Sequence, residues 1–235
     1  MTRAEHEDLW GHLTTFIASA TVGLVIFNFF RIIGLHHASL SETQQQPVSI
    51  ADLPLQLLLE TRVCGSPAVD AYAHVNVSCI VQSPTARWYR QYTAAGGSYH
   101  DLVVHIEPQA DYDGVAVKWG INHKRETAQE CAKACWKHRP GQVDGAFRDL
   151  PCNAFTFCGA EACFEPDKHK HTRGDCWLKF TEAPASPEVN MRGRRPDAVL
   201  ARHPAAPIKS QWVSGVLLPP GVQLRNGSWS PRYYW

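Results

Sequence analysis

Eight cysteines constrain this 235-residue chain more than any other feature of its sequence. All of them follow an apolar run near the N-terminus: Cys64, Cys79, Cys131, Cys135, Cys152, Cys158, Cys163 and Cys176. An even number of cysteines confined to one part of a chain is typical of a disulfide framework in an oxidising compartment. Zinc is the alternative, but neither Cys131/Cys135 nor Cys158/Cys163 resembles a zinc knuckle, so the pattern favours disulfides.

The apolar run is the second constraint. Residues 9–30 carry no formal charge and are bounded by Asp8 and Arg31. As a helix they would span roughly 30 Å, the thickness of a hydrocarbon core. A cleaved signal peptide usually has a basic start and a shorter apolar core. A buried globular helix would need a second long apolar segment to pack against. We therefore predict a transmembrane anchor at residues 9–35 after a cytoplasmic tail at residues 1–8.

The orientation of the anchor is predicted from the residues that follow it in the sequence. Arg3 and Arg31 flank the apolar run and do not decide it by the positive-inside rule. Two Asn-x-Ser sequons, at Asn76 and Asn226, are candidate glycosylation sites in a luminal or extracellular domain. With the cysteines, they predict a single-pass type II protein of the secretory pathway, in the Golgi, the endoplasmic reticulum or the plasma membrane.

Charge argues against nucleic acid as a partner. The formal net charge is +1, and the basic residues are scattered, whereas phosphate binding needs clustered Lys and Arg. The densest basic cluster is Arg192, Arg194 and Arg195, beside prolines in an expected surface loop. The 8 Trp, 9 Phe and 7 Tyr supply core material and argue against disorder.

The remainder divides by composition. We predict four segments: a polar stalk at 36–60, a cysteine-containing extension at 61–110, a core at 111–182, and a Pro- and Arg-rich extension at 183–235 that wraps the surface and ends in an aromatic tail. Strands are expected at 103–106, 153–157, 176–180 and 212–218 from their β-branched or alternating residues. Thr127–Glu130 reads as a capping box that starts a helix through Cys131 and Cys135, and Pro140-Gly141 stops it.

The order of these elements resembles the PAN/Apple domain family. The helix with two cysteines four residues apart is followed by Cys152-Asn153-Ala154-Phe155 and then by Gly174-Asp175-Cys176-Trp177-Leu178-Lys179. The resemblance covers roughly residues 112–180, and the whole chain is similar to PAN-type membrane proteins of green algae and plants. It implies an α+β fold, with one helix on a curved antiparallel sheet behind the N-terminal transmembrane helix.

The resemblance also implies which cysteines pair. In the family pattern, Cys135 would bond Cys152 and Cys131 would bond Cys176. Cys158 and Cys163 are additional to the minimal pattern and would pair with each other, which leaves Cys64 with Cys79.

A His-x-His pair is the strongest metal candidate. His169 and His171 would lie on one face of a strand, with Asp167 and Glu165 nearby. Three cationic neighbours oppose a metal there: Lys168, Lys170 and Arg173. A solvated loop is therefore the favoured interpretation, and we predict no metal and no cofactor.

Catalytic motifs are weak in this sequence. Asp111-Tyr112-Asp113 has the Asp-x-Asp form of luminal sugar transferases, but such enzymes need a doubly wound domain with repeated βα units, which the pattern lacks. The sequence contains no Gly-x-Ser-x-Gly elbow, no Cys-x-x-Cys and no phosphate loop. The interpretation leans away from an enzyme.

Aromatic residues suit a binding surface, because flat rings stack on sugars and anchor protein contacts. We expect Trp119, Trp177 and Trp212 in the core. The candidate ligand-binding residues are those of the tail: Trp229, Tyr233, Tyr234 and Trp235. The leading hypothesis is a membrane-anchored, noncatalytic module that recognises glycan or protein. The alternatives are an accessory subunit or enzyme of Golgi glycan processing, with Asp111, Asp113, His169 and His171 as suspects, and an architectural subunit of a membrane complex. Ligand identity and oligomeric state stay open.

Overall fold

The computed structural model describes residues 54–65, 76–142 and 144–225. All described residues belong to one compact unit, Ser49–Trp235. The described helices include none that is long and apolar enough to cross a membrane. The anchor predicted at residues 9–35 lies outside the described residues.

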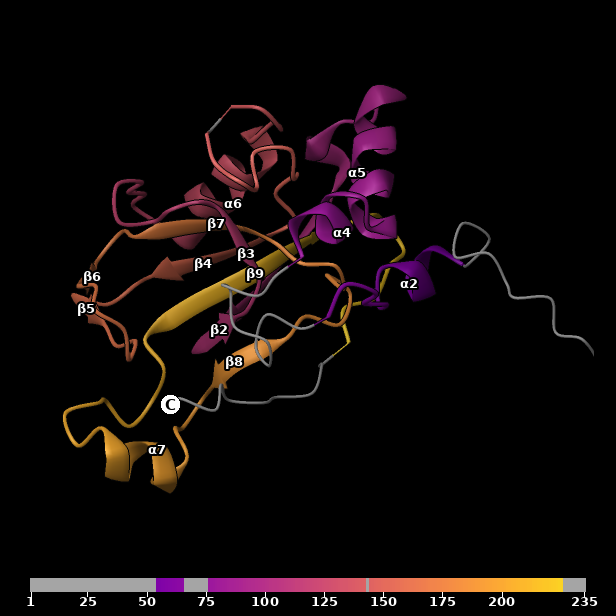
Figure 1. Cartoon of the computed structure of the whole chain (residues 1–235). Helices are drawn as coiled ribbons and strands as arrows, with labels where there is room; N and C mark the ends of the chain where they lie inside the picture. Colours follow the sequence, from indigo (N-terminus) through magenta and orange to yellow (C-terminus); the bar gives the residue numbers. More distant parts are fainter. Residues whose placement is uncertain (1–53, 66–75, 143, 226–235) are drawn as a thin grey trace, which may run out of the picture. The chain divides into compact units, whose positions relative to one another are not determined.

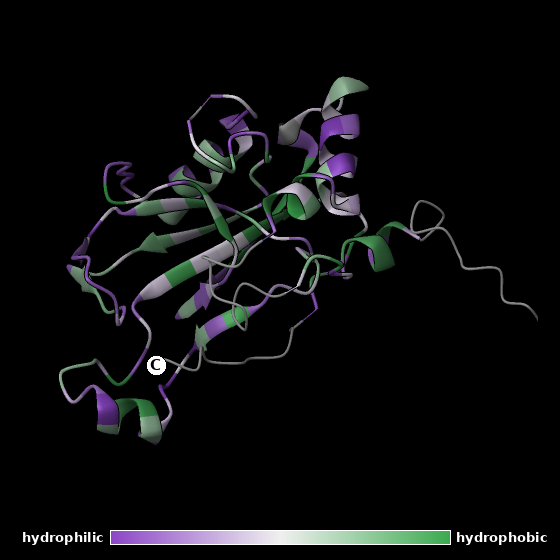
Figure 2. Cartoon of the chain, viewed as in Figure 1, coloured by the Kyte–Doolittle hydropathy of each residue, from purple (hydrophilic) through white to green (hydrophobic). Residues whose placement is uncertain are grey.

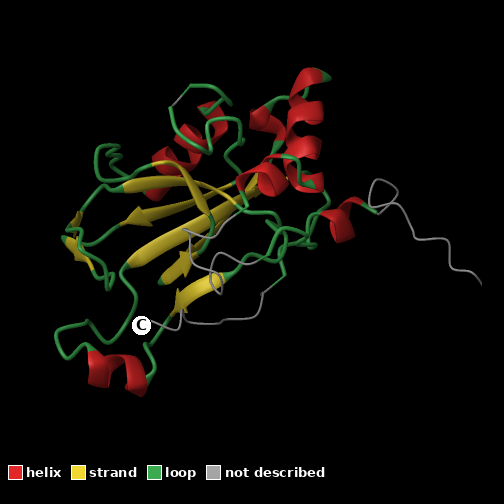
Figure 3. Cartoon of the chain, viewed as in Figure 1, coloured by secondary structure: helices red, strands yellow, loops and turns green. Residues whose placement is uncertain are grey.

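A five-stranded antiparallel sheet forms the centre of the domain (Figure 1). Its strands, in spatial order, are β1 (Val103–Pro108), β9 (Trp212–Leu218), β4 (Ala154–Cys158), β7 (Cys176–Phe180) and β3 (Val115–Lys118). The predicted strands at 103–106, 153–157, 176–180 and 212–218 are confirmed, because β-branched and aromatic residues alternate there with the pleat. The α+β class with an antiparallel sheet is confirmed as well (Figure 3).

Helix α6 (Ala128–Lys137) packs on one face of this sheet, against β4, β7 and β9. Its start follows the capping signal only in part. The Thr127 hydroxyl accepts a hydrogen bond from the Glu130 N–H at 3.1 Å, but the Glu130 carboxylate accepts from the Glu126 N–H rather than from Thr127. The helix ends at Lys137, three residues before the predicted Pro140 stop.

Four disulfides join these elements: Cys64–Cys79, Cys131–Cys176, Cys135–Cys152 and Cys158–Cys163. They are the pairs that the resemblance and the remaining cysteines implied. Two of them attach α6 to the sheet side of the core, where Cys131, Cys135, Cys152 and Cys176 are fully buried. A small domain whose own core is thin is stabilised in this way.

The helices before the sheet were not predicted. They are α2 (Leu55–Leu58), α4 (Val77–Val81) and α5 (Pro84–Ala94), followed by the short 3₁₀ helix η3 (Tyr99–Asp101). Ser83 caps α5 by accepting from the Ala86 N–H, and hydrophilic bands along α5 are visible in Figure 2. The predicted stalk at 36–60 extends too far, because Leu58 and Leu59 are buried in the core.

The C-terminal extension is more ordered than a surface wrap. Strand β8 (Val189–Arg192) pairs with β2 (Ala110–Tyr112) in a second small sheet, and helix α7 (Asp197–Arg202) follows. Strands β5 (Ala162–Cys163) and β6 (His171–Thr172) form a third.

The sequence predicted that the basic cluster of Arg192, Arg194 and Arg195 lies in a surface loop, and this is correct only for Arg194, whose side chain is 58% exposed. Arg195 is fully buried and donates to the carbonyls of Pro207 and Lys209, both at 2.6 Å. Arg192 forms an ion pair with Glu107, and Glu107 also accepts from the Tyr112 hydroxyl at 2.5 Å. These side chains fix β8 and its loop to the sheet.

Candidate binding pocket

A pocket of about 430 Å³ opens on the face of the sheet opposite α6. The pleat explains its composition, since alternate residues of a strand point to opposite faces. On β7, Cys176 is bonded to α6, whereas Trp177 and Lys179 line the pocket. In the alternating sequence of β7, Cys176, Leu178 and Phe180 therefore face the core, and Trp177 and Lys179 face the pocket.

Six rings form the wall of the pocket: Trp119, Phe147, His169, His171, Trp177 and Trp212. The Trp119 side of this wall is open, because Trp119 is 56% exposed. Its ring centroid lies 5.3 Å from that of Trp177 and 5.5 Å from that of His169. The prediction that Trp119 belongs to the core is therefore wrong, whereas Trp212 is buried as expected.

Charged groups that are almost fully buried form the floor. Lys179 Nζ lies 3.4 Å from Asp111 Oδ1 and donates to the Tyr112 carbonyl at 2.5 Å. The other Asp111 oxygen accepts from Asn190 Nδ2 at 2.7 Å, and Asn190 Nδ2 lies 3.4 Å from Glu165 Oε1. One amide thus bridges two carboxylates that come from different parts of the chain.

Burial makes these charges depend on one another. Asp111 and Lys179 are 4% and 7% exposed, and a charge at such a site is retained only when it is paired. Arg195 does not line the pocket but is a second buried cation near its floor: burial lowers its pKa, and the nearby charges of Glu165 and Asp111 act in the opposite direction. The negative charges of Asp111 and Glu165 are therefore matched by the positive charges of Lys179 and Arg195.

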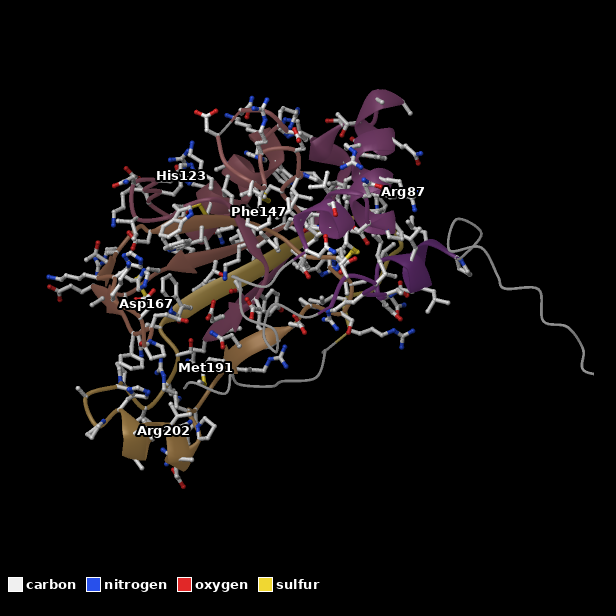
Figure 4. The ribbon with its side chains drawn as sticks, viewed as in Figure 1. Arg87, His123, Phe147, Asp167, Met191 and Arg202 are labelled. Carbon is white, nitrogen blue, oxygen red and sulfur yellow. A yellow bond between two sulfur atoms is a disulfide. The ribbon has the colours of Figure 1, made fainter. Side chains whose placement is uncertain are left out.

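The segment between β5 and β6 closes the side of the pocket. His171 Nε2 lies 3.2 Å from Asp167 Oδ2, and the Asp167 carboxylate also accepts from the His169 N–H at 2.8 Å. Burial would raise the pKa of Asp167, but these hydrogen bonds and the charge of the two histidines hold it below its ordinary value. Figure 4 labels Asp167 and Phe147, both of which line the pocket.

The predicted site residues have different outcomes. Glu165, Asp167, His169, His171 and Asp111 come together in this pocket. These residues form the hydrogen-bonded wall and floor of the pocket. Among the described residues, no group of three or more His, Cys, Asp or Glu side chains has an arrangement suited to a metal ion.

Other candidates lie away from the pocket. Asp113 does not line it; its buried carboxylate accepts from the Gly114 N–H at 2.8 Å. Asn76 is exposed, and its side chain caps α4 by accepting from the Cys79 N–H. The tail candidates Trp229, Tyr233, Tyr234 and Trp235, and the sequon at Asn226, lie outside the described residues.

Comparison with known proteins adds no family. No protein-family model matches the chain, and no curated protein or solved structure has significant similarity to it. The function must therefore be argued from the pocket itself.

The pocket combines aromatic rings with charged and hydrogen-bonding groups. All eight cysteines are in disulfides, so none can act as a nucleophilic thiolate. The Lys179 ammonium forms an ion pair with Asp111 at 3.4 Å. The pocket therefore presents an open indole at Trp119 beside hydrogen-bonded donors and acceptors, together with the His171–Asp167 pair.

Proposed function

We propose that this domain is a noncatalytic glycan-binding module and that the pocket between Trp119 and the Asp111–Lys179 pair holds the sugar. The observation that carries the proposal is an indole that is 56% exposed at the mouth of a cavity whose floor consists of buried, mutually bonded polar groups. A cavity with apolar walls and a few fixed polar groups is the usual form of a small-molecule site.

A sugar matches both parts of the pocket. One face of a pyranose ring is apolar and stacks on an indole, while its hydroxyls both donate and accept. The floor offers carboxylate acceptors at Asp111 and Glu165 and an ammonium donor at Lys179. Because the charges of the floor balance, a neutral polyhydroxyl ligand can bind without leaving a buried charge uncompensated.

The pocket favours a glycan over a protein partner. Protein–protein interfaces are broad, at about 800 Å² per partner, whereas the open indole here stands at a concave site of about 430 Å³. Such a cavity suits one or a few sugar residues at the end of a chain.

The test is direct binding by the full-length chain in a nonionic detergent. An array of mannose-, galactose-, N-acetylglucosamine- and uronate-containing oligosaccharides identifies a binder, which is then titrated calorimetrically. Trp119→Ala is expected to weaken its affinity about tenfold, roughly 1.4 kcal/mol, as for a truncated aromatic anchor.

Ile208→Ala is the matched control, since Ile208 is 57% exposed and does not line the pocket. Equal affinities of the two variants, or no binding across the array, would contradict the proposal. Turnover of a sugar nucleotide by the wild-type chain would favour the alternative of a glycan-processing enzyme.

The setting of the module is part of the same proposal. We infer a PAN/Apple-like domain carried by a type II membrane protein of the secretory pathway, with the anchor at residues 9–35. The four disulfides and the exposed sequon asparagine Asn76 support a luminal or extracellular location. Protease protection in sealed microsomes tests it: the domain is expected to resist digestion until the membrane is permeabilised.

A further inference from the structure

His171 lies in the pocket wall between two carboxylates. Its Nε2 is 3.2 Å from Asp167 Oδ2, and its Nδ1 is 3.7 Å from Asp175 Oδ2. The imidazole is only 3% exposed. Its ring centroid lies 5.7 Å from that of Trp177 and 5.2 Å from that of Trp212, so it is packed among the rings of the pocket.

A neutral imidazole cannot satisfy both carboxylates. It carries one proton, so one ring nitrogen donates and the other presents a lone pair. Whichever nitrogen of His171 holds the proton, the other faces an anion. Nδ1 is buried and makes no hydrogen bond in the structure. A second proton would give Asp167 and Asp175 one N–H each and place a positive charge between two negative ones.

The two carboxylates come from different segments, and of the two only Asp167 lines the pocket, whereas Asp175 is fully buried. Asp167 lies in the segment between β5 and β6, which also contributes Lys168 and His169 to the lining. Asp175 immediately precedes β7 and is held by the Thr172 N–H at 3.1 Å and by the Lys124 ammonium. A doubly bonded His171 would therefore tie the side segment to the strand that carries Trp177.

Other charged or titratable groups also lie near His171. The cationic or titratable groups are His169, Lys168, Lys170 and Arg173 on its own segment and Lys124 behind Asp175. From β7 and β9, Trp177 and Trp212 pack near the ring, and Lys179 and Asp111 in the floor form an ion pair with each other. The groups within 4 Å of its nitrogens are the two carboxylates.

We propose that His171 is a proton-binding site that couples ligand binding to pH: its protonation fixes the side wall, and the pocket then binds sugar more tightly in acidic than in neutral solution. The ligand part rests on the proposed glycan function, whereas the fixing of the wall does not. A wall fixed before binding needs less ordering when the ligand arrives, which increases affinity. Histidine is the side chain suited to this range of pH.

The first test needs no ligand. Hydrogen–deuterium exchange of the full-length chain in detergent is followed at pH 5.5 and pH 8, which bracket the ordinary imidazole pKa of about 6.5. After correction for the intrinsic pH dependence, peptides covering residues 165–170 are expected to exchange about tenfold more slowly at pH 5.5. That factor corresponds to one added charge-assisted hydrogen bond.

Variants assign the effect to His171. His171→Gln is expected to exchange alike at both pH values. Asp167→Asn, whose side chain is 36% exposed and tolerates replacement more easily, is expected to reduce the response if the first variant does not fold. His100→Gln removes an exposed histidine that does not line the pocket and should keep the full response. No response in the wild type, or an unchanged response in His171→Gln, would overturn the proposal.

The second test uses the tightest-binding oligosaccharide of the array, titrated at both pH values. Affinity about tenfold higher at pH 5.5, lost in His171→Gln, supports the coupling. Equal affinity at both pH values refutes it while leaving glycan binding intact. An exchange response without any oligosaccharide binding refutes the glycan function and supports the proton-linked wall.

Discussion

Removing the Cys131–Cys176 disulfide should destabilise the domain more than removing the Cys158–Cys163 disulfide, by an amount set by loop length. The first pair is separated by 45 residues and the second by 5. In the chain-entropy model, loops of these lengths contribute about 4 and about 2 kcal/mol to stability. The Cys135–Cys152 bridge lies inside the longer loop and shortens its free path, which lowers the first value to about 3.5 kcal/mol.

The difference of about 1.5 kcal/mol is more reliable than either value. Both pairs are replaced by alanines, and both are buried, with Cys131, Cys158 and Cys176 at 0% exposure and Cys163 at 5%. The loss of sulfur packing is therefore similar in the two variants and cancels in the comparison. What remains is the restriction that each bridge places on the unfolded chain.

Urea unfolding of the full-length chain under nonreducing conditions, followed by tryptophan fluorescence, measures both losses. Analysis of linked peptides before the titration verifies that the other three bridges are formed in each variant. Equal losses, or a larger loss for the five-residue loop, would refute the argument from loop entropy. It would mean that strain or packing at the individual bridges decides their contribution.

Two further predictions concern buried charge. Asp111→Asn alone should lower the free energy of unfolding in urea by about 3–5 kcal/mol, because it leaves the Lys179 ammonium uncompensated. The double variant Asp111→Leu with Lys179→Met should lose less stability than either single change. Additive losses in the double variant would contradict the pairing. Burial lowers the pKa of His123 and of His138 in the folded chain. As the pH drops below about 6.5, these histidines are therefore protonated in the unfolded chain before they are protonated in the folded one, and the free energy of unfolding should fall. Urea midpoints at pH 7.5 and pH 5.5 measure this, with a smaller difference expected in His123→Gln; a midpoint independent of pH would contradict it.

The strands and α6 could be predicted because their signals are local. Alternation in 153–157 and 176–180 and the cap at Thr127 each lie within a few residues of the element that they specify. Strands β2 and β8 could not be found in this way, since they are 3 and 4 residues long and are defined by their pairing with each other.

Helix α5 was missed for a different reason. Aromatic residues are as typical of strands as of helices, so its composition did not indicate a helix, although Ser83-Pro84 is a recognisable helix start. Trp88 and Tyr92 are four residues apart and stack with centroids at 5.1 Å, and Tyr89 is fully buried. Spacing of three and four residues among the aromatics was the signal that could have identified the helix.

The pocket was only partly predictable. Asp167, His169 and His171 lie within five consecutive residues, so the sequence could show them as a group. The floor is different, because Asp111 is 68 residues from Lys179 and 79 from Asn190. Only the pairing of the strands brings these side chains together, and a single sequence carries no signal of that convergence.

The disulfides and the pocket have a common physical basis. A small domain buries a smaller fraction of its surface than a large one and is correspondingly marginal in stability. Here the disulfides attach α6 to one face of the sheet. On the other face, the cost of burying charged groups is offset by ion pairs, namely Asp111 with Lys179, Glu107 with Arg192, and Asp167 with His171. Because covalent bonds stabilise the first face, the second can retain an exposed indole and buried polar groups that a core of the same size would otherwise exclude. On the proposed function, stability depends on the α6 face and ligand binding on the opposite face, so substitutions in the pocket floor should alter binding and stability together, whereas those at Trp119 should alter binding alone.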